Sequence, residues 1–266
     1  DEGSVIVGRT QSLQASVERF YAQGVTAIDV AESLASFDVD TPAKTVRAFM
    51  DASDFDIVGV RRDGIVAGYV SRESLGTGAC GESLMEFPPG RVMPASAPIF
   101  VIISLLDETP AVFVTILGHV GGVITREDIA KPTVRMWLFG VVTMLEMAFN
   151  RLLESRFPDD SWQESLSPAR LAKAESLHAE RQRVGEPVSL IECLYFTDKA
   201  HILFAQKDIR ELFGIPSATR ARKITADLKR LRDNLAHSGD ILTHGWDTLQ
   251  RLCAVVDLFP KLIDMA

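Results

Sequence analysis

The spacing of apolar residues changes near Pro132, about halfway along the 266-residue chain. Before this point, short β-branched runs alternate with turn residues and brief amphipathic stretches, which is typical of an α+β arrangement. After it, apolar residues recur three and four positions apart over long segments, which is typical of packed helices. The pattern predicts an α+β fold class with two domains, a mixed domain over 1–132 and an all-α domain over 133–266.

The first domain contains an internal repeat with a constant offset. The segment GYVSRESL (68–75) matches GVITREDI (122–129), and the β-rich runs that precede them keep the same offset. One repeat unit reads helix, strand, turn, strand and short helix, and the units span about 25–78 and 88–132. A single unit of this size would expose an apolar sheet face, so we expect the two units to pair.

Each unit also carries turn residues between its two β-rich runs. Asp63 and Gly64 separate the runs of the first unit, and LGHVGG (117–122) separates those of the second. Such residues favour the left-handed backbone of tight hairpin loops, so we expect one β-hairpin in each unit.

The repeat resembles the tandem CBS domain pair, whose βαββα-type units end in glycine, two apolar residues, serine or threonine, two residues, aspartate and an apolar residue. The second unit matches this ending in full. The resemblance implies a nucleotide-binding site at Thr125, Arg126 and Asp128, with the hydroxyl near phosphate and the carboxylate near ribose. In the first unit Ser74 occupies the aspartate position, so we expect one adenosyl site rather than two.

The resemblance implies a regulatory adenine nucleotide as partner, with ATP, ADP, AMP and S-adenosylmethionine as the candidate ligands. Two alternatives remain open. Asp128 could only cap the short helix around it, or the pair could bind no ligand and serve as a dimerisation scaffold.

In the second domain, five helices are expected near 133–155, 167–183, 188–205, 217–237 and 244–265. The most apolar run, at 136–149, is too short to span a bilayer and contains Glu146. We therefore expect a buried helix there and no membrane partner. Glu146 is a candidate polar partner for another residue of the domain.

The helix predicted at 217–237 has an apolar face and a basic face. Its apolar residues lie within about 60° of one another on a helical wheel and predict the buried stripe: Ile224, Leu228, Leu231 and Leu235. Within 218–232, six Lys and Arg residues face one Asp, although the whole chain has a net charge of −8. This local excess indicates that the two halves of the chain have different partners. If the partner of the second half is RNA, Arg220, Arg222, Lys223, Lys229 and Arg230 would contact the strand, and otherwise they form a solvated helix face.

The segment RDNLAH (232–237) precedes Ser238 and Gly239 at the end of this helix. A structural interpretation exists, because helices often end at glycine and the helix dipole favours basic residues near the C-terminus. Arg232 and His237 lie five residues apart and would point in different directions on an ideal helix. They could meet if Gly239 lets the last turn swing round, or if two copies meet across a two-fold axis.

This segment is similar to the signature of HEPN domains, which are helical bundles that dimerise with an arginine and a histidine facing each other. The resemblance implies a HEPN-like bundle over 133–266, a homodimer, and metal-independent RNA cutting that needs no cofactor. The implied catalytic residues are Arg232, Asp233, Asn234 and His237. Histidine can move a proton near neutral pH and arginine binds phosphate oxygens, so a 2′,3′-cyclic phosphate product is expected.

The sequence thus predicts a ligand-regulated endoribonuclease, in which a CBS-like pair senses an adenine nucleotide and controls a HEPN-like bundle. The alternative is a non-catalytic sensing and dimerisation module with a helical protein-interaction domain. Three cysteines show no metal-ligand or redox spacing, which indicates an intracellular and therefore cytoplasmic protein without a bound metal.

Overall fold

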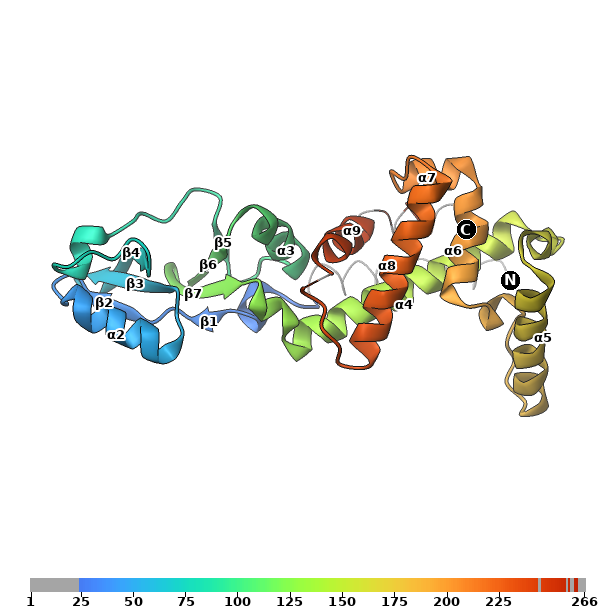
Figure 1. Ribbon diagram of the computed structural model, residues 1–266, viewed down its shortest axis with the longest axis horizontal. Helices are drawn as coiled ribbons and strands as arrows, with labels where there is room; N and C mark the ends of the chain where they lie inside the picture. Colours follow the sequence, from blue (N-terminus) through green and yellow to red (C-terminus); the bar gives the residue numbers. More distant parts are fainter. Residues whose placement is uncertain (1–23, 244, 257, 259–260, 263–266) are drawn as a thin grey trace, which may run out of the picture. The chain divides into compact units, whose positions relative to one another are not determined.

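The computed structural model in Figure 1 describes residues 24–243, 245–256, 258 and 261–262. Within these residues the chain divides into two compact units, and the division falls between Val134 and Arg135. We call the part before the division the α+β unit and the part after it the helical unit. The mixed α+β class expected from the sequence is confirmed.

The first repeat forms a three-stranded sheet with one helix. β2 (Ser36–Asp38), β3 (Ile57–Arg62) and β4 (Ile65–Ser71) lie in the order β2-β3-β4, with β2 parallel and β4 antiparallel to β3. α2 (Ala43–Ser53) joins β2 to β3. Its buried face belongs to the same apolar core as the strands, and this core includes Val46, Met50, Val58, Val60 and Val70.

The second repeat builds the same arrangement and gains one strand. β5 (Val92–Pro94), β6 (Ala111–Ile116) and β7 (His119–Thr125) pair as β2, β3 and β4 do, and α3 (Ile99–Glu108) joins β5 to β6. β1 (Glu32–Ser33), which precedes the first sheet in the chain, pairs antiparallel with β7. The strand order is therefore β1-β7-β6-β5.

The strands keep the offset of the sequence repeat. The starts of β3 and β6, and those of β4 and β7, are separated by the same interval as the matched glycines Gly68 and Gly122. The ladder also shifts register at matching places, after Val60 in one hairpin and after Val114 in the other. The two repeats therefore share their backbone plan as well as their short sequence match.

Both predicted hairpins are present, and both use left-handed loop residues. Asp63 and Gly64 have φ of 54° and 79°, and Leu117 and Gly118 have φ of 52° and 86°. Two successive positive φ values match the twist of a two-residue hairpin. The second loop thus places a leucine where glycine, asparagine or aspartate is favoured, and Leu117 is almost fully exposed.

In each repeat, another stretch of backbone lies against the β-hairpin at the matched glycine. β1 pairs with β7 at Gly122, where a Cβ would lie 3.1 Å from the Cβ of Ala31. In the first hairpin, Tyr69 forms an isolated bridge with Met85, and a Cβ on Gly68 would overlap the carbonyl oxygen of Met85. The matched glycines therefore mark the points where another stretch of backbone lies against a hairpin.

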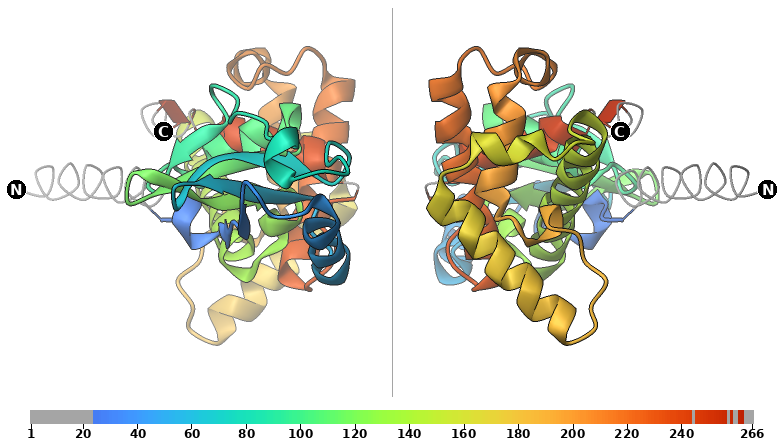
Figure 2. Two further views of the ribbon diagram at one scale, coloured as in Figure 1. Left: turned by 90° about the vertical axis from the view of Figure 1, so that its left-hand side faces the viewer. Right: turned by 90° about the vertical axis from the view of Figure 1, so that its right-hand side faces the viewer.

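The helical unit is built from a succession of helices, which are α4 (Pro132–Arg156), α5 (Pro168–Arg183), α6 (Phe196–Ala205), α7 (Lys207–Leu212), α8 (Ala218–Ala236) and α9 (Trp246–Val256). The first turn of α4 contains the division between the units. α6 and α8 pack side by side, and α5 projects with most of its side chains exposed (Figure 2). Ala174 anchors α5 as a buried residue.

Several helix predictions need correction. The helix expected at 188–205 begins only at Phe196, because the preceding residue has an extended backbone. α7 was not predicted; the extended backbone of Gln206 separates it from α6. Of the helix expected at 244–265, α9 covers the part up to Val256, and much of the remainder lies outside the described residues.

α4 is long and apolar enough to cross a membrane by length and composition alone, and half of its most apolar stretch is buried inside the chain. The apolar run at 136–149 lies inside this helix, which has 25 residues. Its buried side chains include Trp137, Leu145 and Phe149. Glu146 accepts a hydrogen bond of 2.9 Å from Lys199 Nζ on α6, so a buried ammonium is its polar partner.

The crossing at Gly68 yields a test of the fold. The methyl group of Gly68→Ala would meet the carbonyl oxygen of Met85, which is backbone and cannot swing aside. We therefore expect this variant to lower the free energy of unfolding by about 1–3 kcal/mol, the usual cost of overpacking. Gly121→Ala is the matched control, because a Cβ there has its nearest neighbour at 3.6 Å. Denaturant unfolding of both variants measures the difference, and equal stabilities would contradict the close crossing.

Candidate functional site

A cleft of about 610 Å³ lies between the two repeats of the α+β unit. Its walls come from β1, from the segment before β3, from the α3–β6 connection and from the end of β7. Thr125, Arg126 and Asp128, the predicted nucleotide-binding residues, all line it. The structure therefore brings these three residues together in one cavity large enough for a small-molecule ligand.

Asp128 is almost completely buried and already accepts three hydrogen bonds. Its Oδ2 accepts from the backbone N–H of Thr125 at 2.7 Å and from the Thr125 hydroxyl at 3.0 Å, and its Oδ1 lies 2.9 Å from Lys131 Nζ. A carboxylate can accept about four hydrogen bonds, so about one remains for a ligand. Asp128 alone thus cannot accept both ribose hydroxyls without giving up an internal bond.

Lys131 contacts two carboxylates of the cleft lining, and sequence reasoning missed it. Its Nζ donates to the carbonyl oxygen of Val30 at 2.6 Å and contacts the carboxylates of Asp128 and Glu32. Burial alone would lower the pKa of Lys131, but the hydrogen bonds to Glu32 and Asp128 outweigh it and raise the pKa. Its place three residues after Asp128 was the available signal, since such residues are neighbours on a helical turn.

The predicted ligand residue Arg126 has a structural contact in the second repeat. Its Nε donates to the carbonyl oxygen of Leu106 at 2.8 Å, and its Nη2 donates to that of Asp107 at 3.1 Å, at the end of α3. Arg72, the matching residue of the first repeat, likewise donates to the carbonyl oxygen of Met50 at 3.3 Å, near the end of α2. The repeated arginine therefore binds the C-terminal end of each repeat's helix.

Ser74 closes the corresponding turn in the first repeat. Its hydroxyl accepts from the backbone N–H of Ser71 at 2.9 Å, as the Asp128 carboxylate accepts from that of Thr125. Either side chain can cap this turn, but only the aspartate adds a negative charge. The substitution is therefore structurally neutral and changes the electrostatics.

The cleft has a marked excess of negative charge. Among the described residues that line it, a single arginine accompanies seven carboxylate residues, which are Glu32, Asp54, Asp56, Asp107, Glu108, Glu127 and Asp128. Arg72 forms ion pairs with Asp54 at 3.7 Å and with Asp56 at 3.1 Å, and Lys131 compensates part of the remainder. The balance still favours a cationic or neutral ligand over an unaccompanied phosphate.

In the helical unit, the RDNLAH segment is held by several polar contacts. Asp233 accepts from Lys229 Nζ at 2.5 Å and from Arg232 Nη2 at 3.1 Å. These contacts, led by the Lys229 hydrogen bond, lower the pKa of the Asp233 carboxyl group. Asn234 Nδ2 donates to the carbonyl oxygen of Asp240 at 2.6 Å. Asp233 and Asn234 therefore have structural partners within the chain.

α8 ends within one residue of the predicted position. His237 is the C-cap, and Ser238, with φ of 55°, is the left-handed residue that follows it. The backbone N–H of Gly239 donates to the carbonyl oxygen of Asn234 at 2.8 Å, which is the long bond of a Schellman motif. A Cβ on Gly239 would lie 2.9 Å from Asn234 Oδ1, so close approach explains this glycine.

Arg135 on α4 anchors this helix end and was missed by the sequence reasoning. Its Nη2 donates to the carbonyl oxygen of Asn234 at 2.7 Å, and its Nη1 donates to that of Gly239 at 2.9 Å. These partners are far from Arg135 in the chain, so no local spacing reveals the contact. The anchor fixes the backbone on both sides of His237.

Arg232 and His237 do not form a hydrogen bond with each other in the described chain. Arg232 is half-buried against Asp233, whereas the His237 side chain is exposed and has no polar partner among the described residues. The last turn therefore does not bring the pair together within one chain. A meeting across a two-fold axis stays a prediction.

The five predicted RNA-contact residues do not share one face of α8. At 100° per residue, Arg222 and Lys229 lie within about 20° of each other, whereas Arg220, Lys223 and Arg230 point at least about 80° away from Arg222. Arg222 and Lys229 line a cleft of about 710 Å³ in the helical unit. Arg230 forms an ion pair with Asp227 at 2.6 Å.

The cysteines and acidic groups show no metal chemistry in the described residues. Cys80, Cys193 and Cys253 are buried, and burial raises the pKa of the Cys80 and Cys193 thiols. Within the same residues, His, Cys, Asp and Glu form no cluster of three or more that could hold a metal ion.

No protein-family profile and no curated protein matches the chain. Solved structures do resemble its N-terminal part. A CBS domain-containing protein of unknown function from Bacillus anthracis is 13% identical with a TM-score of 0.36, covering 41% of this chain and 91% of that one. CBSX2 from Arabidopsis thaliana is 18% identical with a TM-score of 0.37, covering 42% and 96%. CBSX2 in complex with AMP is 16% identical with a TM-score of 0.38, covering 42% and 98%. At these values the likeness is one of fold, and the CBS-like description rests on the repeat and its sheets.

The Arg135 anchor can be tested without any ligand. Two backbone carbonyls lose their charged donor in Arg135→Met. We expect this variant to lower the free energy of unfolding by about 1–3 kcal/mol and to speed amide exchange at Gly239. Arg151→Met on the same helix is the control, since Arg151 has no polar partner among the described residues. Hydrogen exchange and thermal melting of both variants check this. Unchanged exchange at Gly239 in Arg135→Met would contradict the anchor.

Proposed function

We propose that the α+β unit is a ligand sensor that binds an adenosyl ligand in the cleft at Thr125 and Asp128. The observation that carries this proposal is that both repeats contribute walls to one cavity, which is lined by Thr125, Arg126 and Asp128 of the CBS-like ending. The exposed part of the Thr125 hydroxyl and the remaining acceptor position of Asp128 can bond ribose hydroxyls. AMP, the ligand of the CBSX2 complex, is the first nucleotide to test.

The negative charge of the cleft favours some of the candidate ligands over others. AMP carries a phosphate of about −2 charge, and ADP and ATP carry more. S-adenosylmethionine has sulfonium and ammonium groups that outnumber its carboxylate. Seven carboxylates and one arginine among the described lining residues therefore favour S-adenosylmethionine over the phosphate-bearing nucleotides.

Melting temperature in the presence of each ligand tests this order. We expect S-adenosylmethionine at 100 times its Kd to raise the melting temperature by roughly 5–10 °C. Its affinity should exceed that of ATP by at least about ten-fold, because like charges in one site cost on the order of several kcal/mol. Added salt should weaken the binding of S-adenosylmethionine and should leave the binding of ATP unchanged or strengthen it.

The sequence repeat provides a matched control for this test. Thr125→Ala should reduce the affinity several-fold, whereas Ser71→Ala, the equivalent position of the first repeat, should leave it unchanged. Both variants lose a hydroxyl at the equivalent position of the equivalent turn in the two repeats. A flat response to all four ligands, or equal losses in both variants, argues against the site.

We further propose that the helical unit is a metal-independent endoribonuclease whose site forms across a two-fold axis between two copies of the chain. The supporting observation is that His237 is exposed and has no polar partner in the described part of the chain, while Arg135 binds the backbone on both sides of it. An accessible imidazole on a fixed backbone suits a proton-transfer role. Arg232, half-buried beside Asp233, would bind a phosphate oxygen through its remaining donors.

The proposed step uses the nucleophile of the RNA itself. The 2′-hydroxyl oxygen attacks phosphorus, its proton passes to His237, and the bond from phosphorus to the 5′-oxygen breaks. The protonated His237 then gives a proton to the departing 5′-oxygen and becomes neutral again, and the products are a 2′,3′-cyclic phosphate and a 5′-hydroxyl. Ligand in the other unit can control this step only if it has different affinities for two placements of the paired motifs.

Cleavage of mixed RNA in EDTA tests the nuclease proposal. We expect His237→Ala to lower the rate by about 10²–10⁴-fold, the range for loss of a general acid or base. His119→Ala is the control, because His119 is exposed in a hairpin of the other unit. Product analysis should find the cyclic phosphate.

Mixed dimers test the composite site more sharply. Chains carrying Arg232→Ala and chains carrying His237→Ala should each be inactive and should recover roughly one quarter of wild-type activity when mixed. Half of the dimers would then be mixed. In each mixed dimer, one of the two Arg232–His237 pairs would be intact and the other would lack both side chains. No recovery would exclude pairing between subunits. No cutting by the wild type under any ligand would favour the non-catalytic sensing and dimerisation module.

A further inference from the structure

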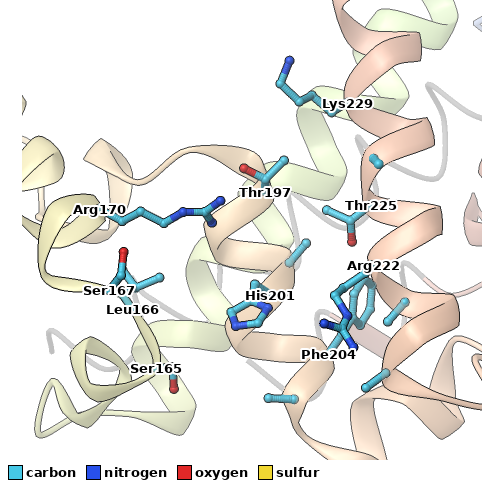
Figure 3. A pocket seen from close by; sticks show the side chains of 15 residues that line it. Ser165, Leu166, Ser167, Arg170, Thr197, His201, Phe204, Arg222, Thr225 and Lys229 are labelled. Atoms are coloured by element: carbon cyan, nitrogen blue, oxygen red, sulfur yellow. The ribbon is translucent and has the colours of Figure 1, made fainter.

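A second cleft, in the helical unit, is required by neither proposed function. It has a volume of about 710 Å³ and lies between the start of α5, the face of α6 and the face of α8 (Figure 3). Buried alanines at positions 200 and 221 form part of its walls, and their small side chains leave the space open. This volume lies in the range of small-molecule sites.

The charge of this cleft is opposite to that of the cleft at Thr125. Arg170, His201, Arg222 and Lys229 line it, and none of its fifteen described lining residues is an aspartate or a glutamate. The whole chain contains 36 Asp and Glu against 28 Lys and Arg. A described lining without carboxylates is therefore unusual for this chain and indicates an anionic ligand.

Two of the four basic groups have no protein counterion in the described part of the chain. Arg170 is neutralised by Asp198, whose side chain is 3% exposed, and Lys229 pairs with Asp233 at 2.5 Å. Arg222 and His201 have no hydrogen bond or ion pair among the described residues. In Figure 3 the Arg222 guanidinium on α8 points toward the His201 imidazole on α6. A ligand oxygen between these two groups could bond both of them.

The other lining residues indicate what kind of molecule carries the anionic group. Leu166 and Phe204 offer apolar surface, and the hydroxyls of Ser167, Thr197 and Thr225 offer a few hydrogen bonds. Apolar walls with a few polar groups suit an organic body rather than a free inorganic ion. The guanidinium group of Arg222 matches the oxygens of a phosphate bidentately, and the His201 imidazole can donate a further hydrogen bond, which suits a phosphate monoester.

We propose that the α5–α6–α8 cleft binds a small organic phosphate monoester, with its phosphate between Arg222 and His201 and its apolar body against Phe204. Arg170 and Lys229 remain paired with their own carboxylates, so the unpaired positive charge on which the proposal relies is that of Arg222. This site is separate from the adenosyl cleft and does not depend on the Arg232 and His237 pair.

Phenyl phosphate is the probe for this proposal, used with the full chain. Ligand-observed NMR should give a Kd of about 1 mM, which is ordinary for a ligand of this size. Benzyl alcohol, which lacks the anion, and inorganic phosphate, which lacks the apolar body, should both bind at least about ten-fold more weakly.

Surface variants locate the binding, and melting curves check that each one folds. Arg222→Gln should weaken phenyl phosphate about ten-fold and His201→Gln several-fold. Ala226→Glu, at an exposed lining position, should abolish binding by adding a carboxylate. Lys207→Gln is the control, because Lys207 is a cation on α7 outside the cleft with a side chain that is 82% exposed.

Three results would overturn the proposal. The first is an unchanged Kd in both Arg222→Gln and His201→Gln, and the second is equal binding of benzyl alcohol and phenyl phosphate. The third is displacement of phenyl phosphate by a short RNA at far lower concentration, which would assign the cleft to a polynucleotide instead.

Discussion

The α+β unit depends on two places where backbone lies directly against a β-hairpin. At Gly122 the strand β1 joins the sheet of the second repeat, and at Gly68 the Met85 segment meets the hairpin of the first. Neither approach leaves room for an unadjusted side chain at the glycine. The crossing of β1 links the first repeat's end of the chain to the sheet of the second repeat. It also carries Glu32 from β1 into the cleft that contains Thr125, so the ligand cavity is a consequence of the crossing.

Much of this unit could be predicted because the repeat is local in sequence. Matched glycines, hairpin loops and strand starts all follow one constant offset, which the chain displays by itself. The limits appear at the cleft. Asp128 and Arg126 were expected to serve a ligand, and the structure shows both engaged in capping and helix-end contacts. Such contacts depend on Lys131, Leu106 and Asp107 being brought close in three dimensions, which a motif does not encode.

In the helical unit, periodicity predicted the buried face of α8 better than the motif predicted its end. Ile224, Leu228 and Leu231 are buried as the helical wheel requires, and Leu235 is half-buried. The wheel could not show that Arg135 binds the carbonyls of Asn234 and Gly239, because that contact joins distant parts of the chain. For the same reason the α5–α6–α8 cleft was invisible in the sequence. Its basic residues come from three helices that are separated in the sequence.

The distribution of charge between cavities says more about ligands than the net charge of −8. One cleft collects seven carboxylates, and the described lining of the other contains none, although acidic residues are in excess in the chain. A cation attracted to the first is repelled by the second, and a phosphate ester meets the opposite balance. The two proposed sites therefore favour ligands of opposite charge. Coupling between them would have to pass through the protein rather than through competition for one ligand.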